Sequence, residues 1–504
     1  MPTTLAAIDI GSNAIRLSVG RIETDRNLTV LDNFREPLRL GRDVFTRRII
    51  SEDTSEAALD VFRRFKEIID RNSVTFTKAA ATSALREATN ADSFIDKISH
   101  VSGIDIDVIS PEEEARLIHL AIAGRVNLKN KTALLIDIGG GSTEITLTYD
   151  GSIVSTESYR LGAVRLLQLL EEKKQGEKKF NALVQEYVGA TRGRLTKEIK
   201  GKKIDLCIGT GGNIEALAVI KKEVLEKDKN GTVSVEDLSS ILKKLMSLSF
   251  DERMQQFRLR PDRADVIVPA SIILQEIIKI AGIEEVVVPR VGLKEGLMID
   301  MAQTVFGEQK HSNRDQVLTS ALELGRKYSF DEQHGTSVAR YAVDLFDQTR
   351  DLHNLGLEHR LLLEAAAILH DVGTFISMTG HHKHTYYLLT ANPIIGFGQS
   401  QSRIVANVAR YHRKSFPKIQ HEPFRELSPK DRVVVSKLAA ILRLADAMDN
   451  EHASRVDSFI AEYKKPKLMI RIRGNGDLLL EKWALMNKAE LFESVFGVKV
   501  SIED

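Results

Sequence analysis

The pattern of hydrophobic and polar positions changes near residue 310. Before it, short apolar runs of strand length alternate with helical segments, and the strand-like runs are 5–10, 14–22, 28–31, 77–81, 104–109, 134–138, 145–149, 203–208 and 285–288. After it, apolar residues recur with helical spacing over 318–328, 335–349, 359–369, 402–412 and 430–448. From about residue 455 the pattern reads strand, helix, strand. The chain is therefore expected to be α/β first, then all-α, with a small α/β C-terminal appendix.

One short motif occurs twice in the α/β region. Asp9-Ile-Gly-Ser and Asp137-Ile-Gly-Gly-Gly-Ser each end an apolar strand and each precede an alternating strand. This repeat predicts two similar lobes that face each other across a cleft. We expect four parts: lobes at 1–126 and 127–310, a helical domain at 311–454 and the appendix at 455–504.

Each motif supplies the residue types that bind phosphate. Glycine backbone can approach phosphate oxygens because no Cβ intervenes, and a carboxylate at the strand end can hold a metal ion. The first motif alone could be an ordinary β-turn, since glycine, serine and asparagine favour turns. The second copy makes that reading weaker. A third glycine-rich turn, 209–213, leads into a helix whose N-terminus can accept an anion.

Composition excludes several classes of protein. The 504 residues hold 71 Lys and Arg against 70 Asp and Glu, so the bulk charge does not indicate binding to DNA. The single cysteine, Cys207, excludes an internal disulfide and fits a reducing compartment. No signal peptide and no apolar run of about 18 residues is evident, so we expect no membrane span and a cytoplasmic location. Histidine is concentrated late in the chain, with most of the 13 after residue 310.

Six strings together resemble the exopolyphosphatase/guanosine pentaphosphate phosphatase (Ppx/GppA) family. They are AIDIGSN at 7–13, ATSALR at 81–86, EEARLI at 113–118, IDIGGGSTE at 136–144, GTGGN at 209–213 and GLKEG at 292–296. The resemblance covers residues 1 to about 305. It implies two actin- and sugar-kinase-like lobes of the ribonuclease H-like type, and the longer members carry an HD-type helical domain.

The resemblance also implies roles for residues. Glu114 corresponds to the family's catalytic base, although glutamates in the first turn of a helix are also explained by the helix dipole. Asp137 corresponds to the catalytic, metal-associated carboxylate, and Asp9 and Glu144 would join it in binding Mg²⁺. The implied phosphate-binding residues are Gly11, Ser12, Asn13, Arg86, Gly139, Gly140, Gly141, Ser142, Gly211 and Gly212. Arg39 is a weaker cationic candidate, and Arg165 stands where many members have serine, so it is left outside the site.

An HD-type metal site needs a histidine, an adjacent His-Asp pair and a distant aspartate. His334, His370, Asp371 and Asp446 occur in that order and could bind a divalent metal such as Mn, Fe or Mg. A second metal position could be completed by His382, His384 and His412. The alternative is a relic fold with solvated histidines.

The leading functional hypothesis is an exopolyphosphatase that uses Mg²⁺ to hydrolyse the terminal phosphate of inorganic polyphosphate. The alternatives are removal of the 5′ phosphate of guanosine pentaphosphate (pppGpp to ppGpp) and a non-catalytic alarmone or phosphate sensor. A sugar kinase is disfavoured by the EEAR string and the helical domain. The resemblance implies a homodimer.

Overall fold

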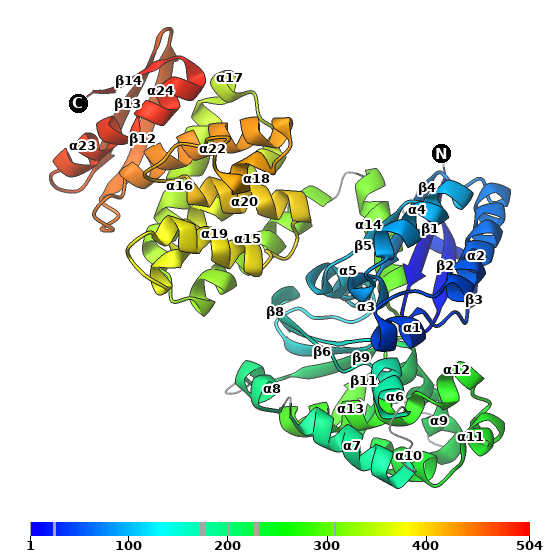
Figure 1. Ribbon diagram of the computed structural model, residues 1–504. Helices are drawn as coiled ribbons and strands as arrows, with labels where there is room; N and C mark the ends of the chain where they lie inside the picture. The colour runs from blue at the N-terminus through cyan, green and yellow to red at the C-terminus, as the bar shows by residue number, and fades with distance from the viewer. Residues whose placement is uncertain are drawn as a thin grey trace. The chain divides into compact units, whose positions relative to one another are not determined.

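The computed structural model describes residues 2–23, 27–171, 177–190, 192–199, 202–225, 231–306 and 309–503. The chain divides into two compact units, Met1–Lys310 and His311–Asp504, and each is described here by itself. Figure 1 shows the sheets of the first unit and the helices of the second.

The first lobe is built on a five-stranded sheet. Its strand order is β3-β2-β1-β4-β5, with β1 antiparallel to β2 and parallel to β4. The strands are β1 (Thr3–Ile10), β2 (Ile15–Ile22), β3 (Leu28–Glu36), β4 (Phe76–Ala81) and β5 (Ile106–Val108). The helices are α1 (Leu40–Arg47), α2 (Glu52–Arg71), α3 (Ser83–Glu87), α4 (Ala91–Ser102) and α5 (Pro111–Ala123).

The second lobe repeats this topology. Its six-stranded sheet has the order β10-β11-β9-β6-β7-β8, and β6 pairs antiparallel with β7 and parallel with β9. The strands are β6 (Thr132–Ile138), β7 (Thr143–Tyr149), β8 (Ser152–Tyr159), β9 (Leu206–Thr210), β10 (Thr232–Ser234) and β11 (Glu285–Val287). β6 therefore takes the place of β1, which confirms the two-lobe interpretation of the repeated motif.

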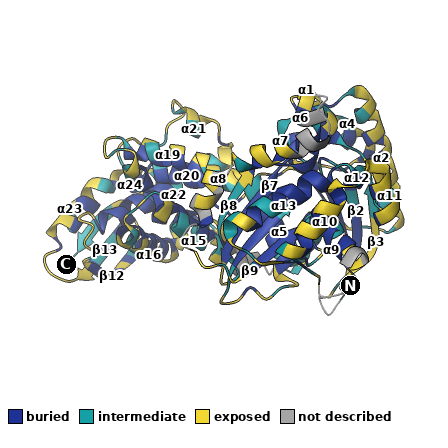
Figure 2. Cartoon of the chain, turned by 90° about the horizontal axis from the view of Figure 1, so that it is seen from below, coloured by how far each residue is buried: buried dark blue, intermediate teal, exposed yellow. Residues whose placement is uncertain are grey.

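The helices of the second lobe are α6 (Ala163–Glu171), α7 (Glu177–Gly189), α8 (Arg192–Ile199), α9 (Gly212–Leu225), α10 (Val235–Met246), α11 (Phe250–Phe257), α12 (Pro261–Ala264), α13 (Ile267–Ala281) and α14 (Leu293–Phe306). α13 is buried along most of its length (Figure 2). The pattern predicts one helix over 263–281, but the structure breaks it into α12 and α13. Pro269 has no N–H and is tolerated in the first turn of a helix, where no intrahelical partner is needed, so α13 begins just before it.

Alternating side chains divide each central strand between two cores. Leu5 and Ala7 of β1, with Ala133 and Leu135 of β6, join one cluster with residues of α5 and α14. The intervening residues of both strands belong to the larger cluster of the first unit. α5 and α14 pack closely, because a Cβ on Gly296 would lie 2.0 Å from the Leu117 carbonyl oxygen. The start of α5 is thereby fixed beside both lobes.

Ion pairs join the first lobe to the second. Arg35 pairs with Asp262 on α12, and Arg39 Nη1 lies 2.6 Å from Asp265 Oδ2. The side chains of both aspartates are at most about one-fifth exposed. Since Arg35 and Arg39 flank the end of β3, these contacts hold that part of the first lobe against α12.

The second unit begins with a helical bundle. Its elements are α15 (Gln309–Lys327), α16 (Glu332–Gln348), α17 (Arg350–His353), α18 (Leu357–Leu369), the 3-10 helix η1 (Val372–Phe375), α19 (His381–Ala391), α20 (Gln399–Arg410), α21 (Glu422–Arg425) and α22 (Pro429–Ala447). α15 extends the predicted segment 318–328 toward the N-terminus. α16, α18, α20 and α22 pack on one another around one hydrophobic cluster.

The end of the chain is a small sheet with two helices. β12 (Val456–Lys464), β13 (Lys467–Gly474) and β14 (Lys499–Glu503) form it in that order, and α23 (Leu479–Lys488) and α24 (Glu490–Phe496) lie between β13 and β14 in sequence. The sequence pattern did not predict β12. Because α23 and α24 pack on α22 and share its hydrophobic cluster, this segment is continuous with the helical core. In the part of the chain described, no helix combines the length and apolar character that crossing a membrane requires.

Candidate functional site

The two repeated motifs form the same tight turn at the ends of β1 and β6. The Gly11 N–H donates to the Ala14 carbonyl at 3.1 Å, and the Gly139 N–H donates to the Ser142 carbonyl at 3.0 Å. A Cβ on Gly140 would lie 3.0 Å from the Ser12 Cβ. The loops are therefore directly opposed, as the repeat predicts.

The third glycine-rich turn closes the same space. Gly211 has a φ of +89°, and a Cβ there would lie 2.9 Å from the Ile138 carbonyl oxygen. A side chain would therefore be both strained and obstructed. α9 begins at the next residue, Gly212, so its free N–H groups lie beside the second loop and can accept an anion.

These turns line a cavity of about 210 Å³. It takes residues from both lobes, and its lining contains four cationic side chains together with five acidic ones. The cationic residues are Arg16, Arg263, Arg290 and Lys294, and the acidic ones are Asp9, Glu114, Asp137, Glu215 and Glu295. Among the described residues, its lining includes no aromatic side chain. The cavity suits a small, highly charged group such as a phosphate.

Glu114 is the glutamate of α5 that enters this cavity. Ser110 caps the helix by accepting from the Glu113 N–H, and Pro111 occupies its first position. Glu113 binds Arg116 through both carboxylate oxygens, at 2.7 and 2.8 Å. Glu114 is buried and accepts from Arg86 Nη1 at 3.0 Å. The first turn of α5 contains three consecutive glutamates, Glu112 to Glu114, and only the third lines the cavity.

Three carboxylates converge at one side of the cavity. One oxygen each of Glu114, Asp137 and Glu144 lies within 4.8 Å of the others. Burial, reinforced by Glu144, raises the pKa of Asp137 to about 7. Burial and the charge of Glu144 raise the pKa of Glu114 well above its usual value, although Arg86 opposes the shift. The cluster is therefore short of positive charge when all three groups are ionised.

The donor set fits a magnesium ion. Carboxylate oxygens are the ligands that Mg²⁺ prefers, and Glu144 Oε2 is buried with no hydrogen-bond partner among the described residues. Asp137 and Glu144 face each other across the pairing of β6 with β7. Asp9, also predicted as a ligand, lies outside this cluster, because it binds Arg16 Nη1 at 2.8 Å.

The structure places most of the predicted phosphate-binding residues in the cavity lining. Those that line it are Gly11, Ser12, Asn13, Gly139, Gly140, Ser142, Gly211 and Gly212. Gly141 and Arg86 do not. Arg86 contacts Glu114 and the Ile109 carbonyl, so it is a partner of Glu114 rather than a free phosphate clamp. Arg39, the weaker candidate, is paired with Asp265.

The sequence reasoning missed all four cationic side chains of the cavity lining, Arg16, Arg263, Arg290 and Lys294. Arg16 is paired with Asp9 across the β1–β2 ladder, and Arg263 donates to the Asn213 side chain. Burial beside Arg16 lowers the pKa of Arg263 to about 10. The run of arginines at 258, 260 and 263 was a usable signal, but nothing local showed that it returns to the glycine turns.

Arg165, which was left outside the site, supports the second loop from behind. Its Nε donates to the Gly141 carbonyl at 2.7 Å, and its guanidinium lies 4.1 Å from the centre of the Phe45 ring. Its Nη2 pairs with Glu87 at 2.5 Å. Arg165 therefore joins the Gly141 turn to α1 and α3 of the first lobe.

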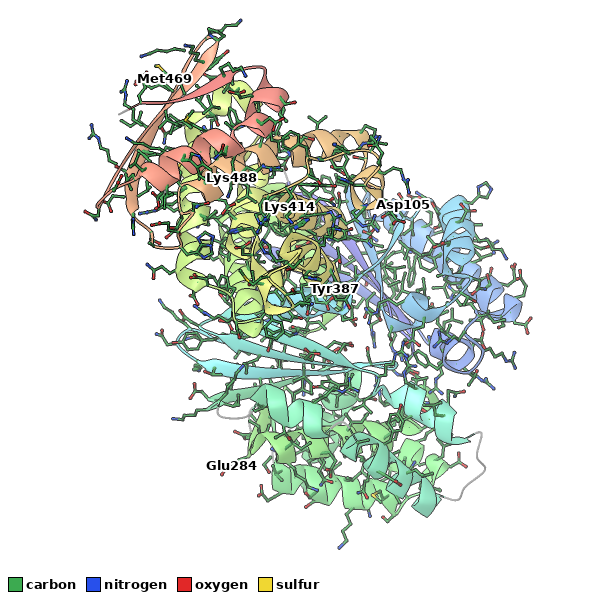
Figure 3. All side chains as sticks on the ribbon, turned by 60° about the vertical axis from the view of Figure 1, so that its left-hand side comes forward. Asp105, Glu284, Tyr387, Lys414, Met469 and Lys488 are labelled. Atoms are coloured by element: carbon green, nitrogen blue, oxygen red, sulfur yellow. The ribbon has the colours of Figure 1, made fainter. Side chains whose placement is uncertain are left out.

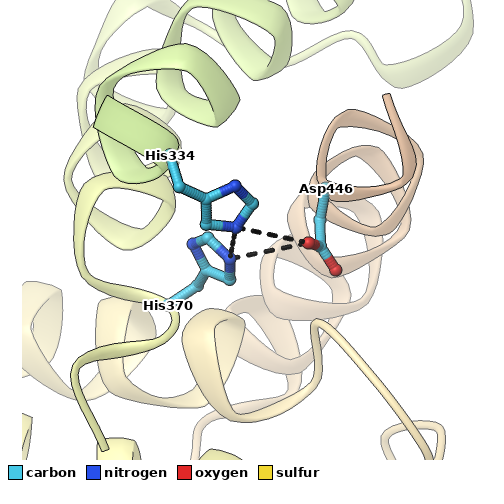
Figure 4. A group of neighbouring side chains, drawn as sticks. All are labelled: His334, His370 and Asp446. Carbon is cyan, nitrogen blue, oxygen red and sulfur yellow. Dashed lines mark hydrogen bonds and ion pairs between the residues drawn. The ribbon is translucent and has the colours of Figure 1, made fainter. Parts of the chain in front are cut away.

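The predicted histidines and aspartates of the helical unit also come together. His334, His370 and Asp446 point toward one another from α16, the end of α18 and α22 (Figure 4). Asp371 lies beside His381 and His412 rather than beside the predicted pair His382 and His384. α19 begins at His381, so the helical turn directs that side chain inward while its neighbour His382 lies outside the group.

Comparison with known proteins follows the same division of the chain. The Ppx/GppA phosphatase family matches residues 19–305, and domain III of Ppx/GppA phosphatases matches residues 318–488. A guanosine-5′-triphosphate,3′-diphosphate pyrophosphatase of Photobacterium profundum is 25% identical over 441 residues, covering 87% of this chain and 85% of that protein. One of Vibrio vulnificus is 25% identical over 420 residues, covering 83% of this chain and 82% of that protein.

Two crystal structures each match about three-fifths of this chain. The Aquifex aeolicus member of the Ppx/GppA family has a TM-score of 0.52 and 27% identity, over 61% of this chain and 99% of its own. An exopolyphosphatase from Cytophaga hutchinsonii has a TM-score of 0.56 and 26% identity, over 60% of this chain and 98% of its own. With opposed glycine loops and a buried carboxylate cluster between two lobes of one topology, this chain belongs to the Ppx/GppA phosphatase family.

Proposed function

We propose that this enzyme hydrolyses the terminal phosphoanhydride bond of inorganic polyphosphate in the cavity between its two lobes. The observation that carries the proposal is the position of Glu114. Its buried carboxylate stands among Asp137 and Glu144, in a cavity whose other walls are phosphate-binding turns. A base so placed can take a proton from water as the water attacks a phosphorus held by those turns.

The reaction needs the terminal phosphoryl group to be held with its bridging oxygen facing away from the attacking water. Backbone N–H groups of the loops at 11–13 and 139–142, with the N-terminus of α9, can bind its outer oxygens. The oxygen of water then bonds to phosphorus, the bond to the bridging oxygen breaks, and the shortened chain leaves with the electron pair. Glu114 holds the proton that the water gives up.

Asp137 and Glu144 would hold Mg²⁺. When bound, the ion offsets the negative charge of the phosphoryl group, and electrostatic stabilisation of this kind dominates phosphoryl transfer. The two carboxylates would hold the positive charge of the ion opposite the glycine loops at 11–13 and 139–142. Arg86 favours the ionised form of Glu114, the form that accepts a proton.

The cavity lining supports polyphosphate as the substrate class. It is charged and, over the described residues, includes no aromatic side chain, so it offers nothing on which a base could stack and reads only the terminal phosphate. The structure of the exopolyphosphatase of Cytophaga hutchinsonii matches 60% of this chain.

Guanosine pentaphosphate is the second candidate. The relatives that match both units of this chain are named as pyrophosphatases of this nucleotide, whereas the exopolyphosphatase match covers 60% of the chain. Its terminal phosphate would meet the same loops.

The test compares both substrates in one assay. Purified enzyme with Mg²⁺ receives long-chain polyphosphate or guanosine pentaphosphate, and kcat/KM for phosphate release is measured for each. We expect the higher value for polyphosphate; a higher value for the nucleotide would transfer the proposal to the second candidate. Release from neither substrate would leave the sensor hypothesis standing.

The role of Glu114 is tested by Glu114→Gln, with Glu113→Gln as the matched control on the same helical turn. We expect kcat of Glu114→Gln to fall by about 10²- to 10⁴-fold, the usual contribution of a general base. Glu113→Gln should stay within a few-fold of the parent, because Glu113 binds Arg116 instead of lining the cavity. Equal rates for the two variants would refute the assignment.

A further inference from the structure

We propose that the helical unit contains a binuclear divalent-metal centre, bridged by Asp371, that hydrolyses phosphate monoesters. The centre is built only from residues of the unit 311–504. The proposal therefore stands or falls independently of the function proposed for the cavity between the lobes.

The first metal position lies among His334, His370 and Asp446. The two Nε2 atoms are 3.2 Å apart, and Asp446 Oδ1 lies 3.8 and 3.6 Å from them. Two ligands bound to one ion at about 2.1 Å and at angles of 90–110° are themselves about 3.0–3.4 Å apart. The three donors therefore lie close to the spacing that one ion imposes, before any adjustment on binding.

The second position lies among Asp371, His381 and His412. Asp371 Oδ1 is 3.1 Å from His381 Nε2 and 3.2 Å from His412 Nε2, and the two nitrogens are 3.2 Å apart. These donors form a nearly equilateral triangle. Its corners all lie about 1.8 Å from its centre, so an ion slightly out of the plane would have normal bond lengths to all three.

Asp371 connects the two positions. Its Oδ1 also lies 3.8 Å from His370 Nε2, a ligand of the first position. The same oxygen is buried and has no hydrogen-bond partner among the described residues. An unsatisfied carboxylate oxygen between two groups of histidines is the arrangement expected of a bridging ligand.

The outer nitrogens of the four histidines fix which nitrogen carries the proton. Nδ1 lies 2.7 Å from the Ala367 carbonyl in His370, 2.7 Å from the Ala409 carbonyl in His412, and 3.1 Å from the Met378 carbonyl in His381. A carbonyl can only accept, so each of these Nδ1 atoms must donate. The lone pairs therefore reside on the Nε2 atoms that face the centre.

His334 completes this arrangement, because its Nδ1 lies 2.8 Å from Asp449 Oδ2. Histidine bound to a carboxylate in this way is the usual support of a metal ligand. With all four Nδ1 atoms protonated, the Nε2 lone pairs of His334 and His370 face each other, as do those of His381 and His412. A cation between its members would satisfy each pair, and in the second pair the Arg413 guanidinium already reaches His381 Nε2.

Basic side chains beside the centre indicate the ligand class. Arg413 Nη1 lies 3.1 Å from His381 Nε2, and Lys488 Nζ lies 2.6 Å from Asp446 Oδ2. Lys488 comes from α23 and is labelled in Figure 3. A metal ion would take the His381 lone pair and release the Arg413 guanidinium, whose planar fork matches a phosphate.

Apolar residues lie in the segment between Asp371 and His381. Phe375 and Met378 are 57% and 74% exposed, and Tyr387 of the following helix, labelled in Figure 3, is 63% exposed. Exposed apolar side chains that flank the ligands Asp371 and His381 in sequence suit the organic part of an ester. A monoester with an aromatic or nucleoside leaving group combines these features with the phosphate site.

In the proposed reaction, the oxygen of water forms a bond to phosphorus and the ester P–O bond breaks. The electron pair of that bond stays on the leaving oxygen, which takes a proton from solvent and becomes an alcohol. The attacking water gives its proton to solvent, which reaches the centre because the Asp371 side chain is 22% exposed. Water and monoester thus become alcohol and inorganic phosphate, without any redox step.

Metal content is the first test. The full-length protein is stripped with chelator, loaded in turn with Mn²⁺, Fe²⁺ or Zn²⁺, and desalted before elemental analysis. The Glu114→Gln variant is used so that the cavity between the lobes cannot hydrolyse substrate. We expect two equivalents of one of these metals to be retained by the helical unit, and Mn²⁺ should give the exchange-coupled magnetic resonance signal of a pair.

Substitutions then separate the two positions. In the Glu114→Gln protein, His334→Ala and His381→Ala should each lose about one equivalent, and Asp371→Ala should lose the coupled signal. His382→Ala is the matched control, since this histidine is also buried on α19 but its side chain lies outside both groups. Unchanged metal content in His334→Ala and His381→Ala, with circular dichroism showing intact folds, would overturn the proposal.

Hydrolysis is measured on p-nitrophenyl phosphate and nucleoside 5′-monophosphates with the same proteins. We expect metal-dependent release of phosphate that falls at least 100-fold in Asp371→Ala and persists in His382→Ala. Arg413→Gln should raise KM more than it lowers kcat while keeping both metals. Two bound metals without any monoester hydrolysis would overturn the proposed activity.

Discussion

At the scale of single residues, the acidic cluster of the cavity is strained electrostatically. The pKa of Asp137 is raised to about 7 from its usual value of 3.8, so the folded protein holds a proton that the unfolded chain has lost between these values. Stability contributed at this site therefore falls as pH rises from about 4 to 7, and the full cost persists above 7. Binding of the cation proposed above would offset that cost.

Asp137→Asn should therefore stabilise the metal-free protein at pH 8, and less at pH 5, because asparagine removes the ionisation that costs free energy. The difference between variant and parent should be near zero at pH 4 and constant above pH 7. Thermal unfolding in EDTA at these pH values measures it. Asp107→Asn, at an exposed position of β5, is the control, and an equal response of the control would contradict the prediction.

Arg86→Gln should shift the pH dependence of the reaction. The Arg86 charge lowers the pKa of Glu114, so its removal raises that pKa further and moves the rise of kcat/KM to higher pH. Rates from pH 6 to 9.5 test this. Arg63→Gln, which breaks an exposed ion pair with Asp60, should leave the profile in place. A profile unmoved in Arg86→Gln would remove Arg86 from the site.

Residue types that combine in one short string were predictable, and residues that meet across the fold were not. The glycine turns and Asp137 could be found because each motif is local. Arg16 and Arg263 lie 247 positions apart (263 minus 16), and nothing in either neighbourhood indicates that they line the same cavity. His381 was missed for a smaller reason, since histidines stand at 381, 382 and 384, and their spacing alone does not tell which side chain the helix directs inward.

At the scale of secondary-structure elements, the glycine loops at 11–13 and 139–142 depend on close backbone packing. A Cβ on Gly162, just before α6, would lie 2.2 Å from the Gly140 carbonyl oxygen. Backbone cannot retreat as a flexible side chain can, so the second loop must move if this space is filled.

Gly162→Ala should therefore lower both stability and activity. We expect a loss of about 1–3 kcal/mol, the usual cost of overpacking, together with a fall in kcat/KM for phosphate release. Urea unfolding and the phosphate assay measure the two effects. Gly189→Ala, whose Cβ would meet nothing within 4 Å, should have neither effect, and a similar loss there would point to a general intolerance of alanine.

Most strands were predictable from the hydrophobic pattern, whereas β8, β10, β12 and the ends of several elements were not. Continuous apolar runs identified β1 and β6, which are buried on both faces, and alternation helped to identify β2 and β7. β12 escaped because exposed positions interrupt its pattern. The break between α12 and α13 was not predictable from Pro269. Proline is tolerated in the first turn of a helix, but it can also kink a longer one, so it fits two helices as well as one.

At the scale of the whole molecule, the chain has separate cores. Each hydrophobic cluster takes its residues from one unit, and the two clusters of the first unit meet along β1 and β6. The predicted boundary between the two lobes separates two sheets but not two compact units, because both sheets belong to the unit Met1–Lys310. The similarity of the two lobes followed from the repeat, but the continuity of the C-terminal sheet with the helical core did not.

Separate cores predict two unfolding transitions. In Glu114→Gln enzyme with Mg²⁺, long-chain polyphosphate should raise the midpoint of one transition by mass action on the folded lobes. Calorimetry measures the shift, and hydrogen exchange assigns it to residues 1–310. A single transition that moves as a whole would show that the units unfold together.

The contacts of Arg35 with Asp262 and of Arg39 with Asp265 also have a kinetic consequence. Asp262 and Asp265 stand on either side of Arg263 in the sequence, and Arg263 lines the cavity, so a separation of the lobes that released product on this side would have to break both pairs. Added salt screens partly exposed charges and should weaken both ion pairs. Ionic strength would then act on turnover in two opposite ways, weakening capture of the anionic substrate while hastening departure of the product.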